Sequence, residues 1–209
     1  MRIREAEFER KLAQTGLWQL PDLLQTLPDE TARLARLCYA ASPADDWLDT
    51  PPEVFFSCAA HARYLRENVS WTRALPEPLF LAYVLHPRVN HEALCDCRPV
   101  FYAALAERLR GLPAEAAILE INRWCAEHVA YQPTDERTRS ALAVLRAGFG
   151  RCGEESMFAV NVLRACGFAA RQVYVPRWAH CDDNHAWVEV RCGGAWHFLG
   201  ACEPEAVLD

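Results

Sequence analysis

Hydrophobic positions recur every three or four residues through the first half of the chain, a spacing typical of amphipathic helices. This pattern predicts helices over residues 3–15, 17–27, 29–41, 54–68, 76–85 and 99–110. Between the third and fourth helices, the run SPADDWLDTPPE (Ser42–Glu53) gathers proline, aspartate and serine. These residues favour a loop, in which the Asp45–Asp46 pair is expected to lie in a solvated turn. The first half is therefore predicted to be helical throughout.

The pattern changes after Gly111 and Pro113. The first predicted element is a helix through Ile118, Ile121, Trp124 and Val129. A polar stretch follows it, and then come a short helix at ALAVLRAG and a strongly apolar helix from Cys152. Alternating, β-branched and aromatic segments then predict strands over 170–175, 185–190 and 195–200. Gly193–Gly194 predicts a tight hairpin between the last two strands. Helices first and antiparallel strands last indicate an α+β fold, divided into a helical N-terminal region (1–112) and a core (113–209).

Composition narrows the class of protein. The chain has 209 residues, 52% hydrophobic and 24% charged, which is enough for a sizeable core. Its net charge of −6 without a basic run argues against nucleic-acid binding. The charged N-terminus and the absence of a long apolar run predict no signal peptide and no membrane partner, hence a cytoplasmic protein whose ten cysteines are free thiols. The abrupt end after GACEPE also fits a domain excised from a longer multidomain chain, in which case the compartment is unknown.

Cys152 is the first candidate for chemistry. Gly148 and Gly150 bracket a turn that delivers Cys152 to the start of the apolar helix. Helix N-terminal N–H groups stabilise a thiolate and could receive the oxyanion of a tetrahedral intermediate. Glu155 is expected to fold back as a capping partner. A buried structural thiol is nevertheless the commoner role for any one of ten cysteines, so the assignment depends on a downstream partner.

That partner is His185. The alternation in HAWVEV places His185, Trp187 and Glu189 on one face of a strand, with His185 at its start. A histidine on a strand is more often a simple hydrogen-bonding residue. Paired with a cysteine at a helix N-terminus, however, it supplies the base that covalent acyl transfer requires.

The order G-R-C-G, L-R-A-C-G-F-A-A-R-Q-V, N-H-A-W-V-E-V and W-H-F-L-G resembles the transglutaminase-like superfamily over roughly Ala114 to Glu205. The run RQVYVPRWAHCDDNHAWVEV with GACEPE after it resembles a bacterial subgroup in which a helical region precedes the core and further domains often follow. The resemblance implies a papain-like α+β fold and a Cys-His-Asp triad that transfers the acyl group of an amide to water or an amine. It makes Cys152 the nucleophile and His185 the base, without a cofactor.

The third member of the triad departs from this pattern. The position at which the resemblance implies an aspartate falls on Gly200. A tight hairpin at Gly193–Gly194 would set His185 opposite residues 201–203, which predicts Glu203 as the orienting acid. Asp183 is the alternative, and it is open whether either orients the ring. Because relatives without a complete triad serve as binding modules, a catalytically inactive domain that binds a peptide or glycan partner is the second hypothesis.

Aromatic residues near His185 are candidates for substrate binding. Trp178 and Trp187 could line an acyl-binding cleft, although aromatic residues on strands usually pack in a core. With a protein or peptide as substrate, we expect a cysteine hydrolase, because no dedicated amine pocket or calcium loop is visible.

Two weak clusters of metal-binding residue types remain. His180 and Cys181 could join His185 and Cys192 around zinc, but their spacing matches no standard zinc motif, so no metal is expected. A second group, His91, Cys95 and Cys97, is more simply a loop packed under the helices.

Overall fold

The computed structural model describes residues 2–135 and 137–208. The first half of this part is helical, with short connections between the elements. These are α1 (Arg2–Thr15), α2 (Leu20–Gln25), α3 (Asp29–Ala41), α4 (Ala44–Asp49), α5 (Pro52–Asn68), α6 (Ser70–Arg73), α7 (Glu77–Phe80) and the π-helix η1 (Leu81–Leu85). The prediction for α3 is confirmed to the residue.

The second half mixes helices and strands, which confirms the predicted α+β class. Its elements are α8 (Arg98–Leu109), α9 (Ala114–His128), β1 (Ala130–Tyr131), α10 (Ala141–Ala147), β2 (Phe149–Gly150), α11 (Cys152–Ala165), β3 (Ala170–Val175), β4 (His185–Cys192) and β5 (Ala195–Leu199). Strands β3, β4 and β5 form an antiparallel sheet in that order, and β1 pairs with β2 in parallel. Within the described residues, no helix has the length and apolar character needed to cross a membrane.

Helix α4 lies where a loop was predicted, and Asp46 is not in a solvated turn. Trp47 is buried, and its indole N–H donates to the carbonyl of Tyr39 at 2.9 Å. Asp46 is only 6% exposed and pairs with Arg88 of the connector 86–97. Tertiary burial of these two side chains stabilises a helix that the local composition did not predict.

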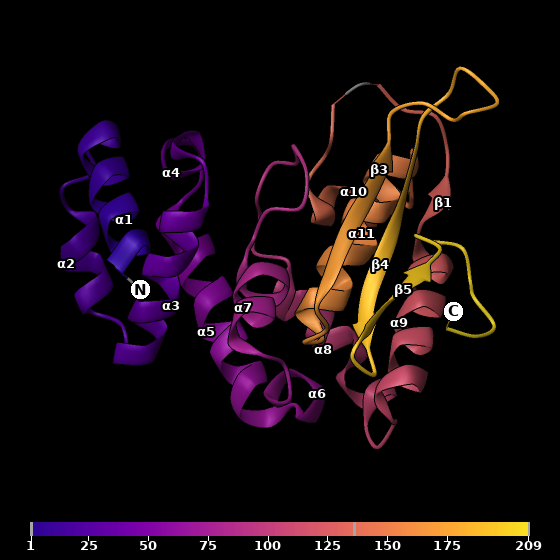
Figure 1. Ribbon diagram of the computed structural model, residues 1–209, viewed down its shortest axis with the longest axis horizontal. Coiled ribbons are helices and arrows are strands. Elements are labelled where there is room, and N and C mark those ends of the chain that lie inside the picture. The colour runs from indigo at the N-terminus through magenta and orange to yellow at the C-terminus, as the bar shows by residue number, and fades with distance from the viewer. Residues whose placement is uncertain (1, 136, 209) are drawn as a thin grey trace.

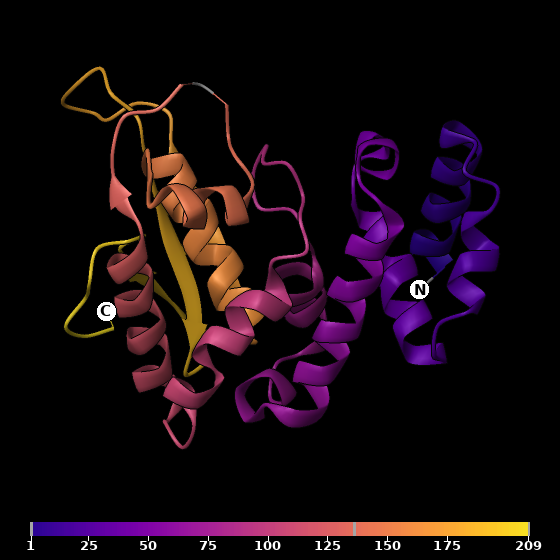
Figure 2. The same ribbon diagram turned by 180° about the vertical axis from the view of Figure 1, so that it is seen from behind.

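Helix α11 lies at the centre of the C-terminal half. Apart from its first two residues the helix is buried, and it packs on α8, α9 and α10 as well as on β3 and β4. In Figure 1 the sheet lies in front of α11, and the reverse view in Figure 2 shows the helices covering the back of the sheet. The loop between β3 and β4 and residues 132–135, which follow β1, extend past the same end of the sheet.

Buried hydrophobic residues form two clusters, one mainly within α1–η1 and the other from Cys97 onwards. Helix α8 packs in the second cluster although the sequence grouped it with the N-terminal region, and the boundary at residue 112 stays a prediction.

The helical half docks on the C-terminal end of α11. The indole of Trp71 stacks on Phe168, with centroids 4.7 Å apart, and donates to the carbonyl of Cys166 at 2.9 Å. Thr72 Oγ1 donates to the carbonyl of Gly167 at 2.9 Å. Gly167 has a φ of +88°, and a Cβ there would lie 2.0 Å from Thr72 Oγ1, so both the backbone and the contact require glycine.

Candidate active site

A buried carboxylate network fixes the start of α11 and with it Cys152, the first residue of the helix. Glu154 accepts the backbone N–H of Arg151 at 3.3 Å in a capping box. Its carboxylate also accepts Thr134 Oγ1 at 2.6 Å and Arg139 Nε at 2.8 Å. Burial alone would raise the pKa of Glu154, but the hydrogen bonds from Arg139 and Thr134 outweigh it and hold the pKa below its ordinary value. The capping residue is thus Glu154, and the expectation for Glu155 is wrong.

The backbone just before Cys152 is held by the short parallel pair of β1 and β2. The backbone N–H of Gln132 donates to the carbonyl of Gly150 at 2.9 Å. A Cβ on Gly150 would lie 2.9 Å from Glu154 Cβ, so glycine at this position allows the capping carboxylate to close over the turn. Cys152 itself is half-buried and a free thiol.

Gln172 of β3 ties the sheet to the first turn of α11. Its amide donates to the carbonyl of Gly153 at 2.9 Å and to Ser156 Oγ at 2.7 Å. Ser156 Oγ in turn donates to the carbonyl of Cys152 at 2.6 Å. Gln172 pairs with Val188 of β4, and β4 begins three residues earlier, at His185. His185 therefore lies at the end of the sheet where α11 begins.

His185 lies on the face of β4 that turns away from α11. Ala186, Val188 and Val190 are buried toward the helix, whereas His185, Trp187 and Glu189 are half-buried on the other face, as the alternation predicted. Among the described residues no hydrogen bond joins Cys152 Sγ to the His185 ring. Cys152 lies on the helix side of the sheet and His185 on the opposite side, both near the same end. Their pairing stays a prediction.

Neither acid proposed as the third member bonds to His185. The predicted hairpin register is confirmed from Val188 opposite Leu199 to Cys192 opposite Ala195. Strand β5 ends at Leu199, which leaves residues 201–203 outside the ladder. Asp183 Oδ1 accepts the backbone N–H of Asn184 at 2.8 Å, and Glu203 is exposed. Within residues 2–135 and 137–208, no carboxylate hydrogen-bonds the imidazole.

A carboxylate that the sequence did not single out occupies the space beside Gly200. A Cβ on Gly200 would lie 2.7 Å from Glu205 Oε1, and that oxygen accepts the Gly200 N–H at 3.2 Å. Buried Asn122 holds both ends of the turn, donating to the carbonyl of Gly200 at 2.8 Å and accepting from the Glu205 N–H at 2.7 Å. Glu205 thus fills the space of the side chain that Gly200 lacks.

Restoring an aspartate at this position should conflict with Glu205. We expect Gly200→Asp to lower the free energy of unfolding by about 2 kcal/mol, because the new side chain overlaps a like-charged carboxylate. In the Gly200→Asp/Glu205→Ala double variant most of this loss should be recovered. Urea unfolding of the two single variants and the double variant measures the coupling, and additive effects would show that the overlap does not exist.

Glu155 is a second buried acid, one turn into α11. Its side chain is 7% exposed and has no hydrogen-bond partner among the described residues. Burial, together with the charge of Glu203, raises the pKa of Glu155 to about 7. Cys202 Sγ lies 3.8 Å from the carbonyl of Glu155, so the segment after β5 packs directly on this turn. Glu155 can therefore hold a proton near neutral pH beside the candidate nucleophile.

This raised pKa predicts a loss of stability as the pH rises. Between its ordinary value of 4.5 and about 7, the folded state binds more protons at Glu155 than the unfolded state, so the free energy of unfolding falls through that window. We expect Glu155→Gln to remove a drop of about 2 kcal/mol between pH 4.5 and 8, allowing for partial solvent screening. Urea unfolding at several pH values tests this, and parallel curves for the wild-type and variant proteins would contradict it.

Aromatic rings extend the site along the outer face of the sheet. Trp178, in the β3–β4 loop, lies nearly parallel to Trp187, with an interplanar angle of 10° and centroids 6.4 Å apart. The His185 ring stacks on both, at 5.9 and 6.1 Å. Phe198 on β5 continues the row and is 48% exposed. The rings form one partly open surface next to His185, on which a role for Trp178 and Trp187 in substrate binding stays a prediction.

The residues weighed as an alternative zinc site, for which no metal was expected, do not lie together. Cys192 lies at the opposite end of β4 from His185, and His180 and Cys181 are exposed in the β3–β4 loop. In the described part of the chain, no three His, Cys, Asp or Glu side chains form a group suited to a metal ion.

Comparison with known proteins gives two findings. Residues 103–201 match the family model of the transglutaminase-like superfamily. The fold is similar to the crystal structure of a protein from Cytophaga hutchinsonii provisionally described as a cysteine protease, with a TM-score of 0.48 and 18% identity over 69% of this chain. The chain spans half the length of that protein. No curated protein matches the sequence.

Proposed function

The chain belongs to the transglutaminase-like superfamily through residues 103–201, and on this premise we propose that it is a cysteine-dependent enzyme that transfers the acyl group of peptide or side-chain amides. The observation that carries the proposal is the placement of Cys152. A half-buried free thiol stands as the first residue of the central helix, on a turn fixed by the buried Glu154 network. His185 begins β4 at the same end of the sheet.

In the proposed reaction the sulfur of Cys152 attacks the amide carbonyl. His185 accepts the thiol proton and returns it to the departing amine, and an acyl-enzyme remains. Backbone N–H groups of the first turn of α11 would stabilise the oxyanion. Because no hydrogen bond joins His185 and Cys152, the proposed proton transfer requires the two side chains to approach each other when substrate binds.

Hydrolysis is the favoured outcome. The row of Trp178, Trp187 and Phe198 leaves an open surface beside His185, so water can reach the acyl-enzyme. Glu203, Asp183 and Glu205 are the candidate acids for orienting the ring. Of these, Glu205 occupies the space beside Gly200, and burial, together with the charge of Glu203, raises the pKa of Glu155.

The second candidate function is a catalytically inactive module that binds a peptide or a glycan-linked partner. Two observations favour it: no carboxylate bonds to the His185 ring in the described residues, and the aromatic row is exposed enough to bind a partner without chemistry.

Alkylation rates separate the two functions. Cys152 and the exposed Cys181 each lie alone in a tryptic peptide, residues 152–164 and 178–191, so iodoacetamide labelling of both can be followed by mass spectrometry in one digest. An enzyme should label at Cys152 several-fold faster than at Cys181 near neutral pH, although Cys181 is more exposed. A rate at Cys152 no faster than at Cys181, together with no cleavage of a fluorogenic peptide-amide library, would leave the binding module as the function.

A further inference from the structure

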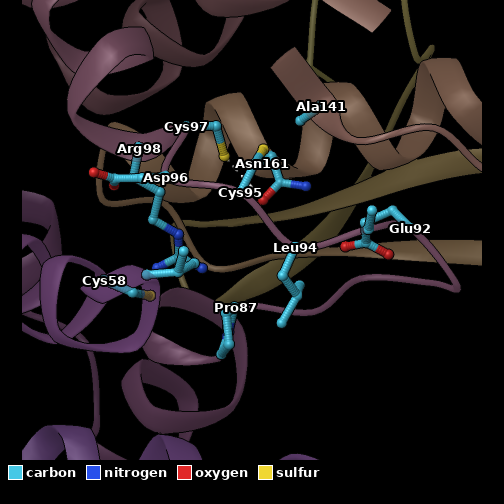
Figure 3. Close-up of a pocket in the computed structure, with 12 residues that line it drawn as sticks. Cys58, Pro87, Glu92, Leu94, Cys95, Asp96, Cys97, Arg98, Ala141 and Asn161 are labelled. Carbon is cyan, nitrogen blue, oxygen red and sulfur yellow. Dashed lines mark hydrogen bonds between the residues drawn. The ribbon is translucent and has the colours of Figure 1, made fainter. Parts of the chain in front are cut away.

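A second pair of thiols lies at the end of the connector between η1 and α8. The backbone N–H of Cys97 donates to the carbonyl of Cys95 at 2.9 Å, which closes a three-residue γ-turn. The turn brings the two side chains to the same side, and Figure 3 shows their sulfur atoms next to each other. Both are free thiols. Such a turn keeps the two Cα atoms within the separation that a disulfide requires.

The two sulfurs differ in their surroundings. Cys97 is buried, 4% exposed, and its Sγ lies 3.8 Å from Asn161 Oδ1 on α11. Cys95 is half-buried, and both cysteines line one pocket (Figure 3), together with Pro87, Glu92 and Leu94. Cys95 is therefore the more exposed of the two thiols, and Cys97 is the buried one.

The pKa values of the two thiols shift in opposite directions. The hydrogen bond from Cys97, supported by donors at Leu142, Ser140 and Ala141, lowers the pKa of Cys95 to about 6. The same contact and its burial raise the pKa of Cys97. These directions favour the thiolate at the more exposed Cys95 and the thiol at the buried Cys97.

We propose that Cys95 and Cys97 form a redox-active dithiol that reacts with small-molecule disulfides. Cys95 Sγ attacks one sulfur of the disulfide, a mixed disulfide forms, and the first small thiolate leaves and is protonated. Cys97 then gives up its proton and attacks Cys95 Sγ, which releases the second small thiol. Two protein thiols are oxidised to one disulfide, and one small disulfide is reduced to two thiols.

The site is separate from Cys152 in the fold and in its chemistry. Cys95 and Cys97 belong to the connector and line a pocket that does not include Cys152, which is the first residue of α11. Oxidation would take Cys97 Sγ away from Asn161 and Cys95 away from its donors at the start of α10, so the segment that leads to β2 would respond to the redox state.

Treatment with glutathione disulfide tests the proposal in the full chain carrying Cys152→Ala, so that the outcome is independent of the proposed enzymatic function. Cys95 and Cys97 are the only cysteines in tryptic peptide 89–108, since the Arg98–Pro99 bond resists trypsin. We expect this peptide to lose two hydrogens at pH 7 and to react at least tenfold faster than the Cys181 peptide. With Cys97→Ser added, the reaction should stop at a glutathione adduct on Cys95.

Cys192→Ser is the matched control, because it removes a half-buried thiol at the end of β4, outside the lining of this pocket, and should leave the peptide's reaction unchanged. Cys95→Ser should abolish the reaction of the peptide, since Cys97 is buried. Thermal unfolding of each variant checks that it folds. The proposal is overturned if the peptide reacts no faster than the Cys181 peptide, or if the wild-type pair keeps a glutathione adduct that never resolves.

Discussion

Replacing Cys152 by alanine should lower turnover of an amide substrate by about three orders of magnitude or more. The sulfur forms the bond to the acyl group in the proposed reaction, and no other nucleophile shares its position at the start of α11 within the described residues. The side chain is half-buried and makes no hydrogen bond there, so the fold should be unaffected. Steady-state kinetics on a fluorogenic peptide amide, with the thermal unfolding midpoint as the check on folding, measure the effect.

The controls for this experiment lie elsewhere on the same chain. Cys181→Ala removes an exposed thiol and should leave turnover unchanged, whereas His185→Gln should fall close to Cys152→Ala because the two groups act as one unit. Turnover that survives Cys152→Ala within a factor of ten would reject Cys152 as the nucleophile, whatever the fate of the His185 variant.

The sequence predicted the elements whose pattern is long and regular. Helix α3, strand β3 and the hairpin register between β4 and β5 follow directly from periodicity and from Gly193–Gly194. Strands β1 and β2 have two residues each, too few for any alternation to show. Helix α4 depends on burial of Trp47 and on the pairing of Asp46 with Arg88, 42 residues away, which no local pattern contains.

The sequence predicted where Cys152 and His185 lie in their helix and strand, but their pairing stays a prediction, and contacts that depend on packing were not predicted. The motif placed Cys152 at the start of a helix and the alternation placed His185 at the start of a strand, as the structure has them. A helix-capping argument alone could not distinguish Glu154 from Glu155, since one residue of helix rotation decides which acid turns back to the cap and which is buried. Glu205 was missed because its contact with Gly200 depends on a turn that Asn122 holds, and Asn122 belongs to α9, far earlier in the chain.

Glu154→Ala should lower the free energy of unfolding by about 4 kcal/mol. The carboxylate is fully buried and bonds to Arg139, Thr134 and the helix cap, so its removal leaves a half-buried guanidinium and unpaired donors at the start of α11. Urea unfolding measures the loss. Glu107→Ala, which breaks an exposed pair with Arg110, is the matched control and should cost less than about 0.5 kcal/mol.

Glu154→Ala also tests whether the stability of the first turn of α11 controls the reactivity of Cys152. Because Glu154 fixes the turn that presents Cys152, Glu154→Ala should also slow iodoacetamide labelling of Cys152 relative to Cys181 under conditions where the protein is folded. Glu154→Gln keeps the acceptor for the Arg151 N–H but loses the charge, so it should retain most of the labelling rate while still losing stability. If Glu154→Ala destabilised no more than Glu107→Ala, the buried network would not be what holds the first turn of α11, and the presentation of the sulfur would have to depend on Gln172 and Ser156 alone.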